Sequence, residues 1–254
     1  MEFFDSHAHY NDEHYNEDRD NLINTMFDDG ITRLVCAGYN VASSIEAINI
    51  AKKYDHIYAT CGISPNDIED FSEENLKKIE ELAKNEKVVA IGEIGYDYYW
   101  NKDKKEIQKE YFSKQIEIAN RLNLPIVIHS RDAYIDTIDM IRNISKVNKK
   151  GIFHCCQLNQ ELIKNAVNEG FYISFSGNVT FKNAKSDECI KLVPLDKILI
   201  ETDSPYLSPE PLRGTRNNSS NVKLVAKKIS EVLNMEIGEI ASITYENANR
   251  IFNI

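Results

Sequence analysis

The chain has 254 residues, of which 42% are hydrophobic, and its formal net charge is −10 at pH 7. This length and composition allow a large buried core, so we expect a single domain over residues 1–254. The acidic balance argues against a broad basic face that would bind nucleic acid through many phosphates, and any phosphate contact is expected to be local.

Eight short apolar segments are predicted to be strands. Each is too continuously apolar to have a solvent-exposed face, which is typical of parallel strands that are buried on both sides. In chain order they are residues 2–6, 32–38, 57–63, 88–94, 124–130, 151–156, 171–177 and 197–203.

Longer amphipathic segments alternate with these strands and are predicted to be helices. Gly30 and Ser72 are typical of a helix end and a helix start, respectively. The predicted helices lie within residues 18–30, 72–86, 104–123, 221–234 and 237–252. Eight βα units in a chain of this size predict an α/β protein with a closed (β/α)₈ TIM barrel. A closed barrel has no free sheet edge, so no obligate protein partner is implied.

Cysteine content and the N-terminal residues indicate the compartment. The five cysteines include the adjacent pair Cys155 and Cys156 but no CxxC motif, which differs from a secreted disulfide framework. The N-terminus does not resemble a signal peptide, and no apolar run reaches the roughly 20 residues of a membrane span. We therefore expect a cytoplasmic protein without membrane association.

Ionisable residues cluster where the predicted strands end, which is where TIM barrels carry their active sites. Each alone has an ordinary explanation, such as a buried histidine, a salt bridge or a helix cap. Together on one barrel mouth they would be electrostatically costly unless a cation compensated them. These residues are His7, His9, Glu93, His129, His154 and Asp203.

Histidine and carboxylate ligands without thiolates predict two divalent ions (Mg, Mn or Zn) rather than a structural zinc site. One ion would bind His7, His9 and Asp203. The other would bind the histidines after the fifth and sixth strands, with Glu93 bridging. Asp203 is predicted to act as the general base, so both carboxylates are candidate catalytic residues.

Two further features near this end of the barrel are candidate substrate contacts. Arg213 and Arg216 flank a glycine in a predicted loop, and arginine is suited to bidentate phosphate binding. Trp100 is the only tryptophan and follows several tyrosines. It would either stack a nucleobase, worth about 1–3 kcal/mol per base, or serve only as packing.

Six motifs carry a resemblance to a known family: DSHAHYND, GEIGYDYYW, LPIVIHSRDAY, FHCC, GFYISFSGNVTFKNA and IETDSPYLSPEPLRGTRN. In this order and spacing the chain resembles the TatD family of metal-dependent deoxyribonucleases in the amidohydrolase superfamily. The resemblance implies a TIM barrel with two divalent ions that acts as a 3′ to 5′ exonuclease on DNA ends, with RNA as an open alternative. The ligands it implies are the six residues named above.

The sequence departs from the family pattern at three places. Ser64 replaces a histidine that the resemblance implies as a substrate contact after the third strand, so Ser64 is a candidate substrate-binding residue. Gln157 lies where the family usually has Phe-Ser-Gly after His-Cys, and Leu212 replaces a second histidine. The metal ligands that the resemblance implies are therefore kept, whereas some of the substrate-contacting residues that it implies are replaced.

Two other functions remain open at this point. The same machinery could cleave another bond, as in an esterase that deacylates D-aminoacyl-tRNA or in another amidohydrolase, and the thinned phosphate contacts favour this alternative. The chain could also be a metal-binding scaffold with little catalysis. A candidate base such as Asp203 argues against the scaffold, because a purely structural site has no need for one.

Overall fold

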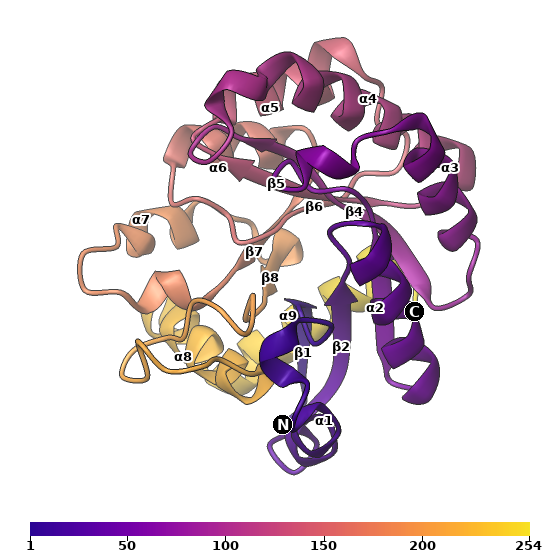
Figure 1. Ribbon diagram of the computed structural model, residues 1–254. Helices are drawn as coiled ribbons and strands as arrows, with labels where there is room; N and C mark the ends of the chain where they lie inside the picture. Colours follow the sequence, from indigo (N-terminus) through magenta and orange to yellow (C-terminus); the bar gives the residue numbers. More distant parts are fainter.

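Eight parallel strands form one sheet in which each strand pairs with the next along the chain (Figure 1). The computed structural model describes residues 1–254. The predicted α/β class and (β/α)₈ barrel are confirmed. The strands are β1 (Phe3–Ala8), β2 (Ile31–Ala37), β3 (Ile57–Cys61), β4 (Val88–Asp97), β5 (Ile126–Arg131), β6 (Ile152–Phe153), β7 (Tyr172–Phe175) and β8 (Ile198–Ile200).

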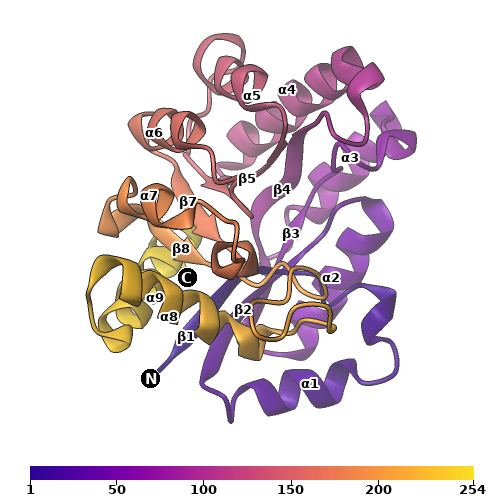
Figure 2. The ribbon, with the colours of Figure 1, turned by 90° about the vertical axis from the view of Figure 1, so that its left-hand side faces the viewer.

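Nine α-helices accompany the strands, and most of them surround the barrel (Figure 2). All five predicted helices are present, whereas α2, α5, α6 and α7 were not predicted individually. The α5 and α7 helices have six residues each, which is too short to show a period. The helices are α1 (Arg19–Met26), α2 (Val41–Lys53), α3 (Glu73–Leu82), α4 (Lys105–Leu122), α5 (Tyr134–Asp139), α6 (Gln160–Asn168), α7 (Ser186–Lys191), α8 (Val222–Leu233) and α9 (Ile237–Phe252).

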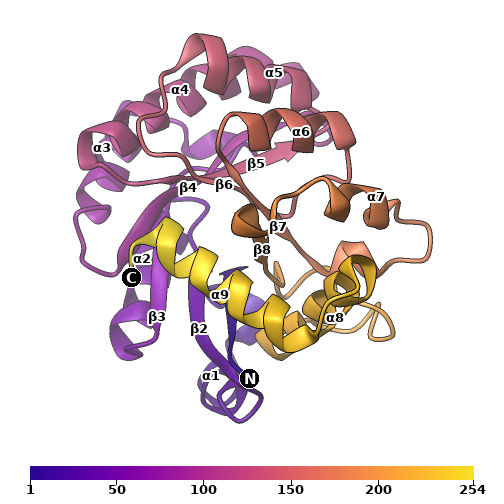
Figure 3. The same cartoon turned by 180° about the vertical axis from the view of Figure 1, so that it is seen from behind.

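A small apolar cluster fills the barrel interior below the strand ends. It includes Val127 of β5 and Ile152 of β6, and it is covered by Ile251 and Phe252 of α9. Figure 3 shows α9 crossing this end of the barrel. Side chains two residues apart in a strand share a face, so a polar layer lies above this apolar floor.

The first and last strands meet without a backbone ladder, since the pairing runs only from β1 to β8. Between the two strands themselves, side-chain hydrogen bonds close this seam. The Ser6 hydroxyl donates to the Ile200 carbonyl at 2.9 Å and lies 2.9 Å from Ser174 Oγ. All three residues are buried, so the contacts are shielded from competing water.

Asp5 completes the seam from the outer face of β1. This fully buried carboxylate accepts hydrogen bonds from the Thr202 backbone N–H at 2.9 Å and the Thr202 hydroxyl at 2.6 Å. The Ser219 hydroxyl, just before α8, donates to it at 2.7 Å. One side chain therefore joins β1, the segment after β8 and the start of α8.

The fourth strand is longer than predicted, and Glu93 lies inside it rather than at its end. The register between β4 and β5 shifts between Ile91 and Ile94, so Glu93 sits in an irregular stretch of the strand. Gly95 follows with a φ of +142°, and a Cβ there would lie 2.0 Å from the His129 carbonyl oxygen. The absence of a side chain at Gly95 allows β5 to approach this closely.

None of the helices combines the length and the apolar character that crossing a membrane requires.

We predict that Asp5→Ala will lower the free energy of unfolding by about 3 kcal/mol, because three buried donors lose their acceptor. Urea unfolding followed by circular dichroism measures this change. Asp29→Ala serves as the control, since Asp29 forms an exposed ion pair with Lys223 and should change stability by roughly 0.5 kcal/mol or less. Equal effects of the two substitutions would contradict this role of Asp5.

Candidate metal centre

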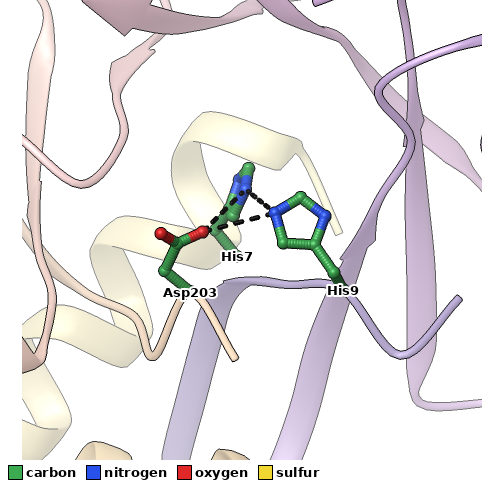
Figure 4. Close-up of side chains that lie close together, drawn as sticks. All are labelled: His7, His9 and Asp203. Carbon is green, nitrogen blue, oxygen red and sulfur yellow. Dashed lines mark hydrogen bonds and ion pairs between the residues drawn. The ribbon is translucent and has the colours of Figure 1, made fainter. Parts of the chain in front are cut away.

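Three of the predicted ligands converge across the seam between β1 and β8. His7 lies in β1, His9 follows it, and Asp203 follows β8. Figure 4 shows the two rings and the carboxylate pointing toward one another. Asp203 Oδ1 lies 3.3 Å from His9 Nε2 and 3.7 Å from His7 Nε2, and the two Nε2 atoms are 3.3 Å apart.

Backbone hydrogen bonds hold these residues in register. The Asp203 N–H donates to the His7 carbonyl at 3.0 Å, and the His9 N–H donates to the Ser204 carbonyl at 2.7 Å. Asp203 has a φ of +54°, a left-handed conformation that aspartate tolerates better than most residues. The segment after β8 is thus tied directly to the histidines of β1.

The other three predicted ligands form a second group beside the first. Glu93 Oε1 lies 2.6 Å from His154 Nε2 and 3.6 Å from His129 Nδ1. The same oxygen is 3.7 Å from His7 Nε2 in the first group. The structure therefore brings all six residues together, with Glu93 between the two groups.

The histidines are oriented by partners behind them. The His129 Nε2–H donates to Asp97 at 2.9 Å, which turns the Nδ1 lone pair toward the site. The His9 Nδ1–H donates to the Ala37 carbonyl at 3.2 Å, so that Nε2 faces His7 and Asp203. Glu201 is fully buried, with Oε1 3.5 Å from His154 Nδ1.

Asp97 and Glu201 were missed in the sequence. Their positions carried a signal, because each follows or ends a strand within a quoted motif and lies near a predicted ligand. Nothing in the sequence, however, showed that Asp97 would face His129, since this contact joins two strands.

The pKa values in the site are set by burial and by the charges and hydrogen bonds of neighbouring histidines and carboxylates. Burial alone would raise the pKa of Glu93, but the His154 charge and the hydrogen bonds with His129 and His154 hold it well below its usual range. Burial opposes a charge on His9, yet the hydrogen bond to Asp203 and the Glu93 charge raise its pKa to about 9. Burial, reinforced by the His154 charge, lowers the pKa of His7.

This donor set fits divalent cations. His7, His9 and Asp203 form one group of ligand atoms that lie within 4.8 Å of one another, and Glu93, His129 and His154 form a second such group. Nitrogen atoms that face one another within each group would repel unless a proton or a cation lies between them. The orientation of the histidines by Asp97 and Ala37 leaves lone pairs aimed inward, as metal coordination requires.

A cavity of about 740 Å³ opens directly above these ligands. Trp100, 66% exposed, lines one side, and Tyr206 and Leu207 line another. Gln157 also lines it and exchanges two hydrogen bonds with Asp132, at 3.0 and 3.1 Å. This departure from the family pattern thus joins the loops after β5 and β6.

Ser64 lies beside the site in a smaller side pocket of about 160 Å³. The pocket also contains Tyr39 and Asp67 and shares His9 and Glu93 with the candidate metal centre. Neither lysine nor arginine lines it. The position where the resemblance implies a histidine therefore faces hydroxyl and carboxyl groups.

The two arginines predicted to contact substrate do not line the main cavity. Arg216 forms an ion pair with Asp18, and Arg213 stacks over Phe181 at 4.3 Å. Leu212 beside them is 37% exposed. Their contact with a substrate remains a prediction that would require a ligand extending beyond the cavity.

The barrel and its histidine–carboxylate centre define a metal-dependent hydrolase. The sequence model described as TatD related DNase matches residues 4–253, and the chain belongs to this family.

Relatives and solved structures agree with this assignment. The uncharacterized metal-dependent hydrolase YabD of Bacillus subtilis is 46% identical over 252 residues, covering 99% of both chains. The uncharacterized metal-dependent hydrolase YcfH of Escherichia coli is 34% identical, covering 100% of this chain and 97% of that protein. The crystal structure of YjjV, a TatD homologue from Escherichia coli, has a TM-score of 0.94 at 24% identity and shares the fold over 99% of this chain and 98% of that one.

We predict that Mn²⁺ or Zn²⁺ will raise the melting temperature of chelator-treated protein by roughly 5–10 °C when present at about 100 times its dissociation constant. The reason is that the six ligands converge only in the folded chain. Differential scanning fluorimetry measures the shift.

His154→Ala should lose most of this metal-dependent shift. His14→Ala should keep it, because His14 is exposed and lies outside the cavity. A shift of the same size in both variants would place the bound metal elsewhere.

Proposed function

We propose that this hydrolase is a deoxyribonuclease that removes nucleotides from the 3′ ends of DNA with two divalent ions. The observation that carries the proposal is the pair of ligand groups that face one Glu93 oxygen at the mouth of the barrel. Two adjacent ions are suited to phosphodiester cleavage, because together they stabilise the attacking and the leaving oxygen. Membership of the TatD related DNase family supports the choice of DNA, and RNA is the alternative nucleic acid.

The cavity supports an end of a chain as substrate rather than an extended duplex. Its volume of about 740 Å³ falls within the range of roughly 300–1,000 Å³ that is usual for small ligands. The net charge of −10 disfavours contacts along many phosphates. A terminal segment of one or two nucleotides therefore suits the site better than a long track.

The residues divide the work of hydrolysis between them. When bound, the ions would supply Lewis-acid polarisation of the phosphate and lower the pKa of a water molecule. Asp203 would take the proton of the attacking water, and this role is supported by its carboxylate, which lines the cavity and is 15% exposed, compared with 8% for Glu93. Glu93 holds the two ligand groups together and faces less solvent.

We predict that Asp203→Asn will reduce turnover of single-stranded DNA by about 10²–10⁴-fold, because the general base is removed. Release of nucleotides from a 3′-labelled oligonucleotide in the presence of Mg²⁺, Mn²⁺ or Zn²⁺ measures this. The melting temperature should change little.

Asp187→Asn is the matched control, since Asp187 forms an exposed ion pair with Lys228 on the barrel exterior. Undiminished cleavage by Asp203→Asn would remove Asp203 from the role of base. An inactive, metal-loaded wild type would reject the nuclease itself.

Hydrolysis of an aminoacyl ester, such as a D-aminoacyl-tRNA, is the second candidate function. The side pocket favours it, because Asp67, Tyr39 and Ser64 offer a carboxylate and hydroxyls without a cationic side chain. Such a lining suits the ammonium group of an aminoacyl ester better than a phosphate.

The two functions predict different effects of Asp67→Asn. If the ester is the substrate, this variant should raise KM for a D-aminoacyl ester about tenfold, while an N-acetylated ester is unaffected. If DNA is the substrate, the ester should be a poor substrate for the wild type as well. Parallel assays of both substrates with the same metal-loaded protein distinguish these outcomes.

A further inference from the structure

Arg131, Tyr99 and Trp100 form a cluster on the rim of the cavity, which we call the rim clamp. Arg131 ends β5 two residues after His129, so the two side chains leave the same face of the strand. Arg131 and Trp100 both line the cavity that contains the candidate metal ligands. The clamp thus lies within the same cavity but contributes no ligand to either group.

The Arg131 guanidinium has no polar partner in the protein. Most other arginines of the chain have a polar side-chain partner, as Arg216 has with Asp18 and Arg142 with Glu169. Arg213 also lacks such a partner, but it lies outside the cavity. Arg131 is the only lysine or arginine that lines the cavity, and its hydrogen-bond donors are available to a ligand.

The two aromatic rings hold the guanidinium in place. Its central carbon lies 4.0 Å from the centroid of Tyr99 and 5.7 Å from that of Trp100. The rings meet edge to face, with centroids 4.7 Å apart. Both remain largely exposed, at 55% for Tyr99 and 66% for Trp100. Large exposed rings beside an unpaired cation indicate a binding surface rather than packing.

Asp97 fixes the turn that carries these rings. Its Oδ1 accepts hydrogen bonds from the backbone N–H groups of Tyr99 and Trp100, both at 2.9 Å. Its Oδ2 accepts the hydrogen bond from His129. The position of the rings relative to the candidate metal centre is therefore set by one buried side chain.

We propose that the rim clamp is a nucleotide subsite, in which Arg131 binds a phosphate that is not cleaved and Trp100 stacks the base of the same nucleotide. The inference rests on the proposed nuclease function and adds a specificity determinant to it. A guanidinium provides bidentate hydrogen bonds to phosphate, and an exposed indole face accepts any base. Neither group would be needed for a substrate that lacks a phosphate next to a base.

The single tryptophan allows a direct test, because intrinsic tryptophan fluorescence reports on Trp100 alone. A single-stranded thymidine tetranucleotide is titrated into chelator-treated wild type, so that binding is observed without cleavage. We expect saturable quenching of the fluorescence. Arg131→Ala should weaken the apparent affinity about tenfold or more, and inorganic phosphate alone should leave the fluorescence unchanged.

Steady-state kinetics with metal provide the second measurement. Arg131→Ala should raise KM for the tetranucleotide about tenfold or more, with a smaller change in kcat. The increase in KM for bis(p-nitrophenyl) phosphate, which has no second phosphate, should be smaller. Arg142→Ala is the control, since Arg142 is an exposed arginine outside the cavity, paired with Glu169.

The outcomes separate this inference from the proposed function. Cleavage of the tetranucleotide with unchanged KM in Arg131→Ala and no quenching in the wild type would overturn the clamp and leave the nuclease intact. Quenching that depends on Arg131, in a metal-loaded protein that cleaves no phosphodiester, would support the nucleotide subsite and overturn the nuclease.

Discussion

The closure of the barrel between its first and last strands is the constraint on which the site depends. His7 and His9 belong to one side of this seam and Asp203 to the other. Because no continuous backbone ladder joins β1 to β8, the distance between these ligands is set by the buried contacts of Asp5 and Ser6 and by the two backbone hydrogen bonds of His9 and Asp203. Stability of the fold and geometry of the candidate metal centre are therefore properties of the same few hydrogen bonds.

The sequence allowed the architecture to be predicted because parallel strands that are buried on both faces form continuous apolar runs. The eight runs and the five long amphipathic segments correspond to real elements. Helices such as α5 and α7 escaped prediction since six residues show too little of a helical period. Glu93 was placed at a strand end, whereas an irregular register carries β4 on to Asp97.

The candidate ligands were found in the sequence because a barrel gathers the residues at its strand ends, whatever their separation along the chain. The groups around them were not found, since their roles depend on contacts between neighbouring strands. Asp97 and Glu201 contact histidines from other strands, and Arg131 is distinguished by lining the cavity without a polar partner for its guanidinium. Periodicity and composition do not predict such pairwise contacts between strands.

Because α9 follows all eight strands in the chain, its contacts with β1 can form only late in synthesis. Phe252 packs near Phe4, with ring centroids 6.0 Å apart, so the last helix covers residues of the first strand. A growing chain on the ribosome leaves the apolar interior of β1 uncovered until α9 has been made. Early strands can pair with their neighbours, but the floor of the barrel stays uncovered until α9 packs against it. Completion of the apolar core therefore depends on contacts between the first strand and the helix that follows all the strands.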